Sequence, residues 1–450
     1  NAYNTAIGRS AGRDITTGIQ NTLIGALAGD ALTDADNNVA IGYSAMTTNV
    51  LGSESVAIGT FALNNQNPAT AANMYNVAIG HNSGAAVTTG VFNTLVGGLV
   101  GDALTTGGEN AAFGYAALTL DTLGSHTVAI GPYALQTQNF TTAVDSFNTA
   151  VGYAAGTAVT IGINNTFIGG LAGDADTKGN HTVALGYGAF TTQNFTTATD
   201  TFNTAVGSLA GEANATGVSN TFIGGLAGRN VTGGSNTAVG AAAMDAAVSG
   251  SQNTAVGVNA LGIANGAANN NTAVGVQAGM SVTTGDNNLL LGVDAGQTGS
   301  PGGAITTASN EIVLGDENIS AANIQVDWTV ASDQRDKTDF TALDLGLDFV
   351  KALAPVTYKW DKRSKYGDKT ADNYDLNAQS PDGTHKEDWL DIGFKAQEVQ
   401  TLEEAAGYTT ASKKNLTVST SDDGKQLGLQ YSKFVPILVK AMQEQNALIE

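Results

Sequence analysis

A serine and a lysine stand five residues apart where the composition of the chain changes, Ser332 and Lys337. A serine hydroxyl is a weak nucleophile until a base removes its proton, and a lysine serves as that base when burial or a nearby cation lowers its pKa. Arg335 is a nearby cation in sequence. Attack on the Ala331 carbonyl would give an ester that water hydrolyses, so the chemistry to expect is chain cleavage between Ala331 and Ser332. The two residue types alone favour the alternative of an exposed turn with a salt-bridging lysine.

The charge of the chain also changes at this point. Before Ser332 there are four basic residues against 20 acidic ones, a net charge of −16, in a sequence rich in Gly, Ala, Asn and Thr. From Ser332 onward there are 15 basic and 20 acidic residues, a net charge of −5, in an ordinary α+β sequence. So acidic a surface repels phosphate backbones, and we expect no nucleic-acid binding.

Several classes of site and segment are excluded by composition. Cysteine is absent, which excludes disulfides, thiolate metal sites and a cysteine nucleophile. No apolar run reaches the ~18 residues of a membrane span, so we expect no membrane insertion. No pattern predicts a cofactor. The chain opens inside a repeat, at residues 1–5 and without Met, so we expect further protein upstream.

A short motif, Asn-(Thr/Val)-x-(Ile/Val/Leu/Phe)-Gly, recurs along the first two thirds of the chain. Eleven of its 16 intervals are 17 residues, three are 21, and the other two are 16 and 18. A fixed period of this size predicts a solenoid. The motif is too short for a helix and rich in β-compatible residues, so we expect a parallel β-roll of about 17 rungs, with two short strands per coil. The motif glycines are Gly8, Gly25, Gly42, Gly59, Gly80, Gly97, Gly114, Gly131, Gly152, Gly169, Gly186, Gly207, Gly224, Gly240, Gly257, Gly275 and Gly292.

The strand cores show no apolar/polar alternation, as in Thr149-Ala150-Val151. One strand face can fill the roll, but the other needs a cover that a single chain does not supply. We therefore expect a homo-oligomer, most simply a homotrimer, with the motif asparagines stacked as an internal ladder. The array resembles the left-handed parallel β-roll heads of trimeric bacterial adhesins, although its period is longer.

The three 21-residue intervals each insert four residues. Inserts in a solenoid collect as loops on one face, which is often the binding face. Aromatic residues in these loops are candidate contacts for a receptor, either a sugar or a cell-surface protein. The alternative is that they pack under the loops or fill a seam between chains. The candidates are Tyr75, Phe140, Phe147, Phe195 and Phe202.

Two Asp-Ala-Asp turns, at residues 34–36 and 174–176, are candidate Ca²⁺ ligands. Neither lies in an ordered loop signature such as an EF-hand, so solvated turns are the better interpretation and we expect no metal site.

Between about residue 298 and residue 331 the period dissolves. Residues 299–303 form a Gly/Pro break, and residues 311–315 resemble a degenerate last rung. Residues 324–328 are expected to form a strand, and the bulky Trp328 to cap the end of the solenoid.

Four segments after this stretch carry a family resemblance. Residues 332–337, 353–360, 392–399 and 431–439 match, in order, the patterns Ser-Asp-x-Arg-x-Lys, Leu-x-Pro-Val-x-Tyr-x-Trp, Ile-Gly-Phe-x-Ala-Gln-Glu-Val and Tyr-x-x-Leu-x-Pro-Leu-Leu-Val, with Phe434 in place of a Leu. By these segments the chain end resembles the C-terminal intramolecular chaperone domain of phage tail fibres and endosialidase tailspikes. A related domain occurs in membrane-anchored myelin regulatory factors.

The resemblance implies a chemistry for the residues at the junction. Ser332 would be the nucleophile and Lys337 the general base of a self-cleaving dyad, supported by Asp333 and Arg335. Cleavage between Ala331 and Ser332 would occur once per chain, in cis, after trimer assembly, and the repeats would have no turnover activity.

The resemblance also implies a structural role in a phage tail fibre, as a shaft or receptor-binding segment. The protein would belong to the virion and be extracellular when mature. Its partners would be two further copies of the chain, upstream fibre or virion proteins, and a host cell-surface receptor. Two alternatives stay open. A trimeric bacterial adhesin head predicts a membrane anchor beyond the stalk, and a polysaccharide-degrading tailspike predicts paired carboxylates in a groove.

The expected fold is mainly β in three parts. Residues 1–298 form the β-roll shaft, residues 299–331 a connector and terminal cap, and residues 332–450 an α+β chaperone domain. This domain is expected to end in a helix with an apolar seam of coiled-coil spacing at Val435, Leu438, Met442, Gln445 and Ile449.

Overall fold

The computed structural model describes residues 2–246, 249–263, 266–325, 328–369, 371, 373–409, 414 and 416–450. It contains a parallel β-solenoid of about 17 turns, followed by a part with both helices and strands. The predicted mainly β fold class is therefore confirmed. Contacts divide the chain into two units, Asn1–Asn270 and Asn271–Glu450.

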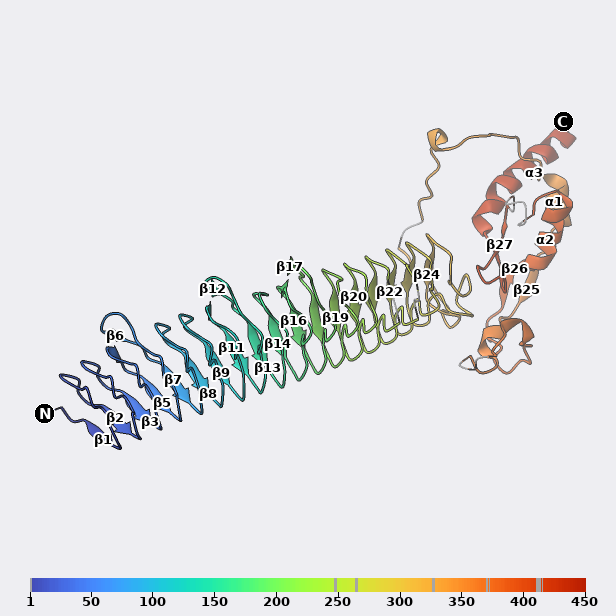
Figure 1. The fold of residues 1–450 in the computed structure, drawn as a ribbon. Helices are drawn as coiled ribbons and strands as arrows, with labels where there is room; N and C mark the ends of the chain where they lie inside the picture. The colour runs from blue at the N-terminus through green and yellow to red at the C-terminus, as the bar shows by residue number, and fades with distance from the viewer. Residues whose placement is uncertain are drawn as a thin grey trace. The chain divides into compact units, whose positions relative to one another are not determined.

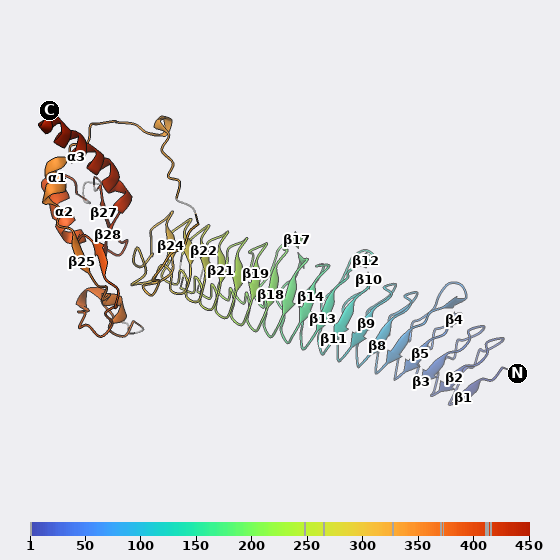
Figure 2. The ribbon, with the colours of Figure 1, turned by 180° about the vertical axis from the view of Figure 1, so that it is seen from behind.

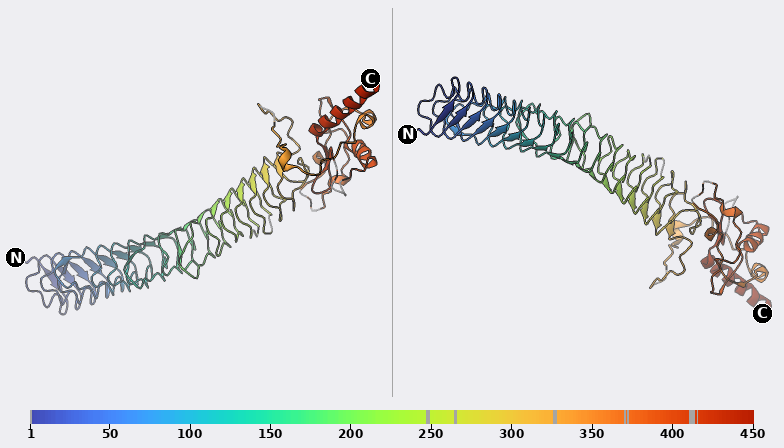
Figure 3. Two further views of the ribbon diagram at one scale, coloured as in Figure 1. Left: turned by 90° about the horizontal axis from the view of Figure 1, so that it is seen from above. Right: turned by 90° about the horizontal axis from the view of Figure 1, so that it is seen from below.

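Each coil of the first unit contributes one three-residue strand that pairs in parallel with the strand of the next coil, so the coils stack side by side (Figures 1 and 3). In this register Ala6 lies opposite Leu23, and Leu23 opposite Ala40. These strands are β1 (Thr5–Ile7), β2 (Thr22–Ile24), β3 (Val39–Ile41), β5 (Val56–Ile58), β7 (Val77–Ile79), β8 (Thr94–Val96), β9 (Ala111–Phe113), β11 (Val128–Ile130), β13 (Thr149–Val151), β14 (Thr166–Ile168), β16 (Val183–Leu185), β18 (Thr204–Val206), β19 (Thr221–Ile223), β20 (Thr237–Val239) and β21 (Thr254–Val256).

The second unit opens with three strands of the same kind. These are β22 (Thr272–Val274), β23 (Leu289–Leu291) and β24 (Ile312–Leu314), and β23 pairs in parallel with both of the others. β24 is the degenerate rung predicted at residues 311–315, and that prediction is confirmed.

The prediction of two strands in every coil is wrong. A second strand, of two residues, occurs only beside the three inserts, and it pairs with a strand of the insert. Elsewhere the return half of a coil consists of turns whose N–H groups bond to carbonyls of the neighbouring coil, as Gly29 N–H does to Ala45 O at 2.9 Å. The short pairs are β4 (Gly52–Ser53) with β6 (Ala72–Asn73), β10 (Gly124–Ser125) with β12 (Val144–Asp145), and β15 (Gly179–Asn180) with β17 (Thr199–Asp200).

The middle residue of each strand fills the solenoid interior, and the residues on either side face outward. Leu23, Ala40 and Phe167 are fully buried middle residues. The third residue of each strand is apolar and only partly covered, as at Ile130 and Ile223. One apolar residue per coil is thus left on the outside of the coil stack.

The expected asparagine ladder is present in the interior. Asn21 donates its amide to Ala35 O at 2.8 Å, and its Oδ1 accepts the N–H of Asn38 at 2.9 Å. Asn38 repeats both bonds with Gly52 and Ser55. Each buried amide therefore satisfies a backbone group of its own coil and one of the next coil.

The ladder loses its asparagine in the three coils that carry inserts, where Ser55, Thr127 and Thr182 stand instead. A buried glutamine 11 residues later in the same coil replaces the missing amide. Gln138 accepts from Asn148 Nδ2 at 2.8 Å and donates to Thr127 Oγ1 at 3.1 Å. Gln66 and Gln193 make the equivalent bonds, so an insert does not interrupt the internal network.

Two carboxyl groups are buried beside these glutamines. Asp121 accepts from Gln138 Nε2 at 2.7 Å and from Gly124 N–H at 3.0 Å, and Asp176 is held in the same way by Gln193 and Gly179. Burial raises the pKa of both carboxyls, against the opposing effect of these hydrogen bonds. The internal bonds of Asp176 give it a packing role inside the coil.

The Asp121→Asn variant is therefore expected to unfold at a higher temperature than the parent at pH 7. A raised folded-state pKa means that the folded state binds the proton more tightly, so this group costs stability as pH rises above its unfolded value of about 4. The gain is on the order of 1 kcal/mol for each unit of pKa shift, and it should vanish near pH 3. Thermal unfolding of the full chain at both pH values measures it.

The first insert provides the matched control. Asn49 occupies the equivalent place and bonds Gly52 N–H at 2.8 Å through Oδ1, so Asn fits there. Asn49→Asp should lower the unfolding temperature at pH 7 and not at pH 3. An equal shift at both pH values would contradict the ionisation argument.

The remainder of the second unit is an α+β arrangement around one apolar core. Its core residues are Leu345, Phe349, Val399, Val418, Phe434 and Ile437. Its elements are η1 (Gln334–Asp336), α1 (Leu347–Ala352), β25 (Val356–Tyr358), η2 (Arg363–Lys365), η3 (Leu376–Ala378), β26 (Asp391–Gly393), α2 (Ala396–Ala405), β27 (Val418–Thr420), β28 (Leu427–Leu429), η4 (Tyr431–Lys433) and α3 (Phe434–Ile449).

Two antiparallel strand pairs and two packed helices build this core. β25 pairs with β26 and β27 with β28, while α1 packs on α3 (Figures 1 and 2). α1 ends just before Pro355, because a proline disfavours the helical conformation of the residue before it. The helix predicted at the chain end is confirmed as α3.

The expectation that Trp328 caps the solenoid is wrong. Its side chain is 74% exposed, as are those of the neighbouring residues in sequence. Of the strand predicted at residues 324–328, Ile324, Gln325 and Trp328 are not in a strand, and Val326 and Asp327 lie outside the described residues.

Glu403 ties α2 to the segment before β27. Its buried carboxylate accepts the N–H of Thr417 at 2.6 Å and that of Leu416 at 3.2 Å. Glu403→Ala leaves these donors without partners and should lower the free energy of unfolding of this part by about 3 kcal/mol. Urea titration followed by tryptophan fluorescence reports it, since all three Trp residues lie in the last third of the chain. Glu403→Gln keeps one acceptor and should lose less; an equal loss would contradict the hydrogen-bond explanation.

Candidate functional site

Ser332 and Lys337 lie on the two sides of a single 3₁₀ turn, η1. Asp333 caps the turn by accepting the N–H of Arg335 at 2.9 Å, and Lys337 N–H closes it on Gln334 O at 3.2 Å. The turn folds the chain back so that Lys337 Nζ donates to Ser332 Oγ at 2.5 Å. This is the contact that a general base must make with the nucleophile it activates.

Arg335 does not face the lysine as expected. Its guanidinium forms an ion pair with Asp333 at 2.6 Å. Hydrogen bonding within this pair raises the pKa of Arg335 and lowers that of Asp333. A guanidinium so paired is directed away from Lys337, so Asp333 and Arg335 shape the turn that brings the dyad together.

The dyad is exposed in the single chain. No residue of η1 is buried, and Ser332, Lys337 and the nearby Phe340 all face solvent. A lysine base works best out of water, where its neutral form is favoured. The turn thus has the geometry of a nucleophile–base pair, and a cover over it is missing from one chain.

The comparison with protein families bears on the same residue. Residues 332–408 match the family model described as the chaperone of endosialidase, Peptidase_S74, and the match begins at Ser332. The C-terminal part of this chain is a chaperone-of-endosialidase domain. This family is associated with self-cleaving chaperone domains. No curated protein and no solved structure matches the chain.

A β-solenoid with a chaperone-of-endosialidase domain fits a protein of the tail-fibre or tailspike type. Among the described residues, no helix is long and apolar enough to cross a membrane, and no cluster of three or more His, Cys, Asp or Glu could hold a metal ion.

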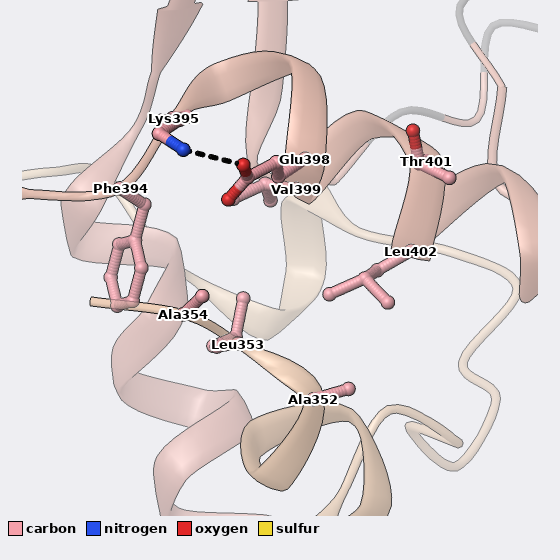
Figure 4. A pocket seen from close by; sticks show the side chains of 9 residues that line it. All are labelled: Ala352, Leu353, Ala354, Phe394, Lys395, Glu398, Val399, Thr401 and Leu402. Carbon is pink, nitrogen blue, oxygen red and sulfur yellow. Dashed lines mark hydrogen bonds and ion pairs between the residues drawn. The ribbon is translucent and has the colours of Figure 1, made fainter. Parts of the chain in front are cut away.

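A pocket of about 280 Å³ lies in the chaperone domain, between the C-terminal end of α1 and the start of α2 (Figure 4). Phe394, Leu353 and Leu402 give it an apolar lining, and the ion pair of Lys395 with Glu398, at 2.8 Å, lies at its side. Neither Ser332 nor Lys337 lines it. The pocket suits an apolar side chain and holds no nucleophile–base pair.

The structure separates the five candidate receptor contacts into two groups. Phe140 and Phe195 are only 4% and 6% exposed, so their rings pack beneath the insert loops and are not available to a receptor. This corrects the expectation for these two residues. Tyr75, Phe147 and Phe202 are exposed, and their receptor contact stays a prediction.

The partners of these exposed rings were not singled out from the sequence. Tyr75 stacks on Phe92, Phe147 lies against His126, and Phe202 stacks on His181. The signal was available, because each of these residues immediately precedes the ladder position of its coil.

Proposed function

We propose that this chain is a tail-fibre or tailspike segment whose chaperone domain brings three chains together and then releases itself by cleavage between Ala331 and Ser332. The hydrogen bond between Lys337 Nζ and Ser332 Oγ, at the first residue of the family match, carries this proposal.

The chemistry follows from the turn. The neutral amine of Lys337 takes the proton of Ser332 Oγ, and this oxygen attacks the carbonyl carbon of Ala331. The new C–O bond forms as the C–N bond of the peptide breaks, and Lys337 returns the proton to the departing amine of Ser332. Water then hydrolyses the ester, which leaves a carboxylate on Ala331 and restores the Ser332 hydroxyl.

Exposed apolar side chains support assembly as the step that precedes cleavage. α3 buries Phe434, Ile437 and Ala441 against its own domain. The predicted seam residues Val435, Leu438, Met442 and Ile449 point away from that core and are exposed. A helix with a second apolar stripe is available for a coiled coil with other copies.

The solenoid offers a second surface to other copies, since the outward third residue of every strand is apolar. Covering these stripes in a homotrimer would also place a neighbouring chain near the exposed dyad, which couples cleavage to assembly. As a fibre, the trimer would join upstream virion proteins and meet a host cell-surface receptor outside the cell.

Mass spectrometry and light scattering on the purified chain test the proposal. The expected result is a trimer whose chains consist of residues 1–331 and residues 332–450. A trimer of intact chains would refute self-cleavage and leave the domain as a permanent cap. Cleaved monomers would refute the coupling of cleavage to assembly.

A further inference from the structure

We propose that the coils between residues 75 and 202 carry a binding strip for a linear glycan without negative charge. The inference rests on the proposed receptor-binding role and names the chemistry of the receptor. The aromatic strip consists of Tyr75, Phe92, His126, Phe147, His181 and Phe202.

The six residues occupy the same place in their coils, directly before the ladder position, and form three pairs between neighbouring coils. The rings of Tyr75 and Phe92 stack with centroids 5.4 Å apart and planes 11° apart. Those of His181 and Phe202 stack at 5.3 Å and 15°, and those of His126 and Phe147 lie 5.2 Å apart. Corresponding members of successive pairs are three coils apart, roughly 14 Å at the usual strand spacing.

These rings are held in a backbone conformation that disfavours them. All six residues have φ between 48° and 60°, a region that bulky side chains rarely adopt. Coils outside the strip place Asn37, Ser219 or Asn287 there, and Asn in particular adopts the conformation more readily. Exposed aromatic rings at a strained position do not stabilise the fold, and such strain gathers at functional sites.

Polar groups lie within hydrogen-bond reach of the rings. His126 lies between Glu109 and Asp145, at 3.1 Å and 3.0 Å, while Asp200 accepts from Asn180 Nδ2 at 3.0 Å. A depression of about 450 Å³ beside Phe92 is lined by Glu109 and Thr94.

Flat apolar rings with carboxylates, imidazoles and amides at their edges are the groups that bind sugars. The C–H face of a pyranose packs on an aromatic ring, and its hydroxyls bond to polar groups at the rim. Because the rim carries Glu109, Asp145 and Asp200 in a strongly acidic unit, an anionic glycan is repelled and a neutral or amino-bearing one is accepted. The regular spacing of the pairs suits a ligand that repeats along its length.

The strip is distinct from the surface expected to pack against other copies. The outward apolar residue of the strands recurs in every described coil, from Ile7 to Leu314, whereas the strip is limited to residues 75–202. A seam between chains would need to run along the whole solenoid, so a local row of rings favours a ligand.

An array of linear oligosaccharides in neutral, amino-bearing and anionic sets, followed by calorimetry with the full chain, tests the proposal. Binding is expected in the neutral or amino-bearing set, with affinity that rises with chain length as further pairs are engaged. The double variant Phe147→Asn/Phe202→Asn uses a residue already present at this position in other coils, and should weaken binding about tenfold. Tyr153→Ala/Tyr187→Ala removes exposed rings outside the strip and should change affinity less than about twofold.

Three outcomes overturn the proposal: no binding in the neutral and amino-bearing sets, an undiminished affinity in the Asn double variant, or a change in its oligomeric mass, which would place the rings in a seam between chains. Trimer mass and cleavage of the parent are measured on the same samples. The proposed function can therefore stand while the glycan inference fails, and the reverse.

Discussion

Ser332→Ala and Lys337→Ala are each expected to keep the chain at full length under conditions in which the parent gives two fragments. Removing the hydroxyl removes the nucleophile, and removing the amine leaves that hydroxyl without the base now 2.5 Å away. Residues that act as one unit lose nearly all activity when either is removed, so cleavage should slow by at least about 10³-fold in both variants. Intact-mass spectrometry over time gives the rates.

Lys351→Ala is the matched control, because this exposed lysine of α1 pairs only loosely with Asp348, at 3.9 Å, and has no place at the junction. It should cleave at the parent rate, and all three variants should remain trimers. Cleavage of Lys337→Ala at the parent rate would exclude lysine as the base. Cleavage of Ser332→Ala at Ala331 would exclude the dyad altogether.

The coil of the solenoid was predictable because its cause is local and repeats. Gly25 shows why the motif ends in glycine, since its φ is +134° and an added Cβ would lie 2.5 Å from Gly42 O in the next coil. Only glycine combines that conformation with so close an approach of two backbones. The same holds for the asparagine ladder, whose amide serves its own coil and the next one.

What the sequence left undetermined depends on contacts between positions that the period does not link. Phe140 and Phe202 both lie in inserts, yet one is buried and the other exposed, because a loop can fold back over one ring only. The replacement of the ladder amide was visible in the sequence, since each Ser or Thr at that position is followed 11 residues later by Gln, as in Thr127 and Gln138.

At the junction, the resemblance predicted the dyad, and residue spacing did not predict the turn that joins it. Arg335 was expected near the lysine, but Asp333 is closer along the turn and captures its charge. Burial of the dyad depends on neighbouring chains, about which a single sequence carries little information.

Leu438→Glu combined with Met442→Glu is expected to convert the trimer into monomers and to stop cleavage as a consequence. Both side chains lie on the face of α3 away from its own core, and Met442 is 70% exposed, so the single chain should fold normally with the charges in place. In a three-helix seam the same charges would be buried close to one another, at a cost of several kcal/mol per site. Light scattering gives the mass, and tryptophan fluorescence verifies that the domain is folded.

Gln443→Glu adds the same charge to an exposed site of α3 outside the predicted seam and serves as the control. It should remain a trimer and cleave at the parent rate. If the double variant stays trimeric, the solenoid stripe and not the helix holds the chains together. If it becomes monomeric and still cleaves, the dyad needs no cover from a second chain, and the exposed turn of Ser332 and Lys337 is already competent. Only loss of both trimer and cleavage, with a folded domain, links assembly to release.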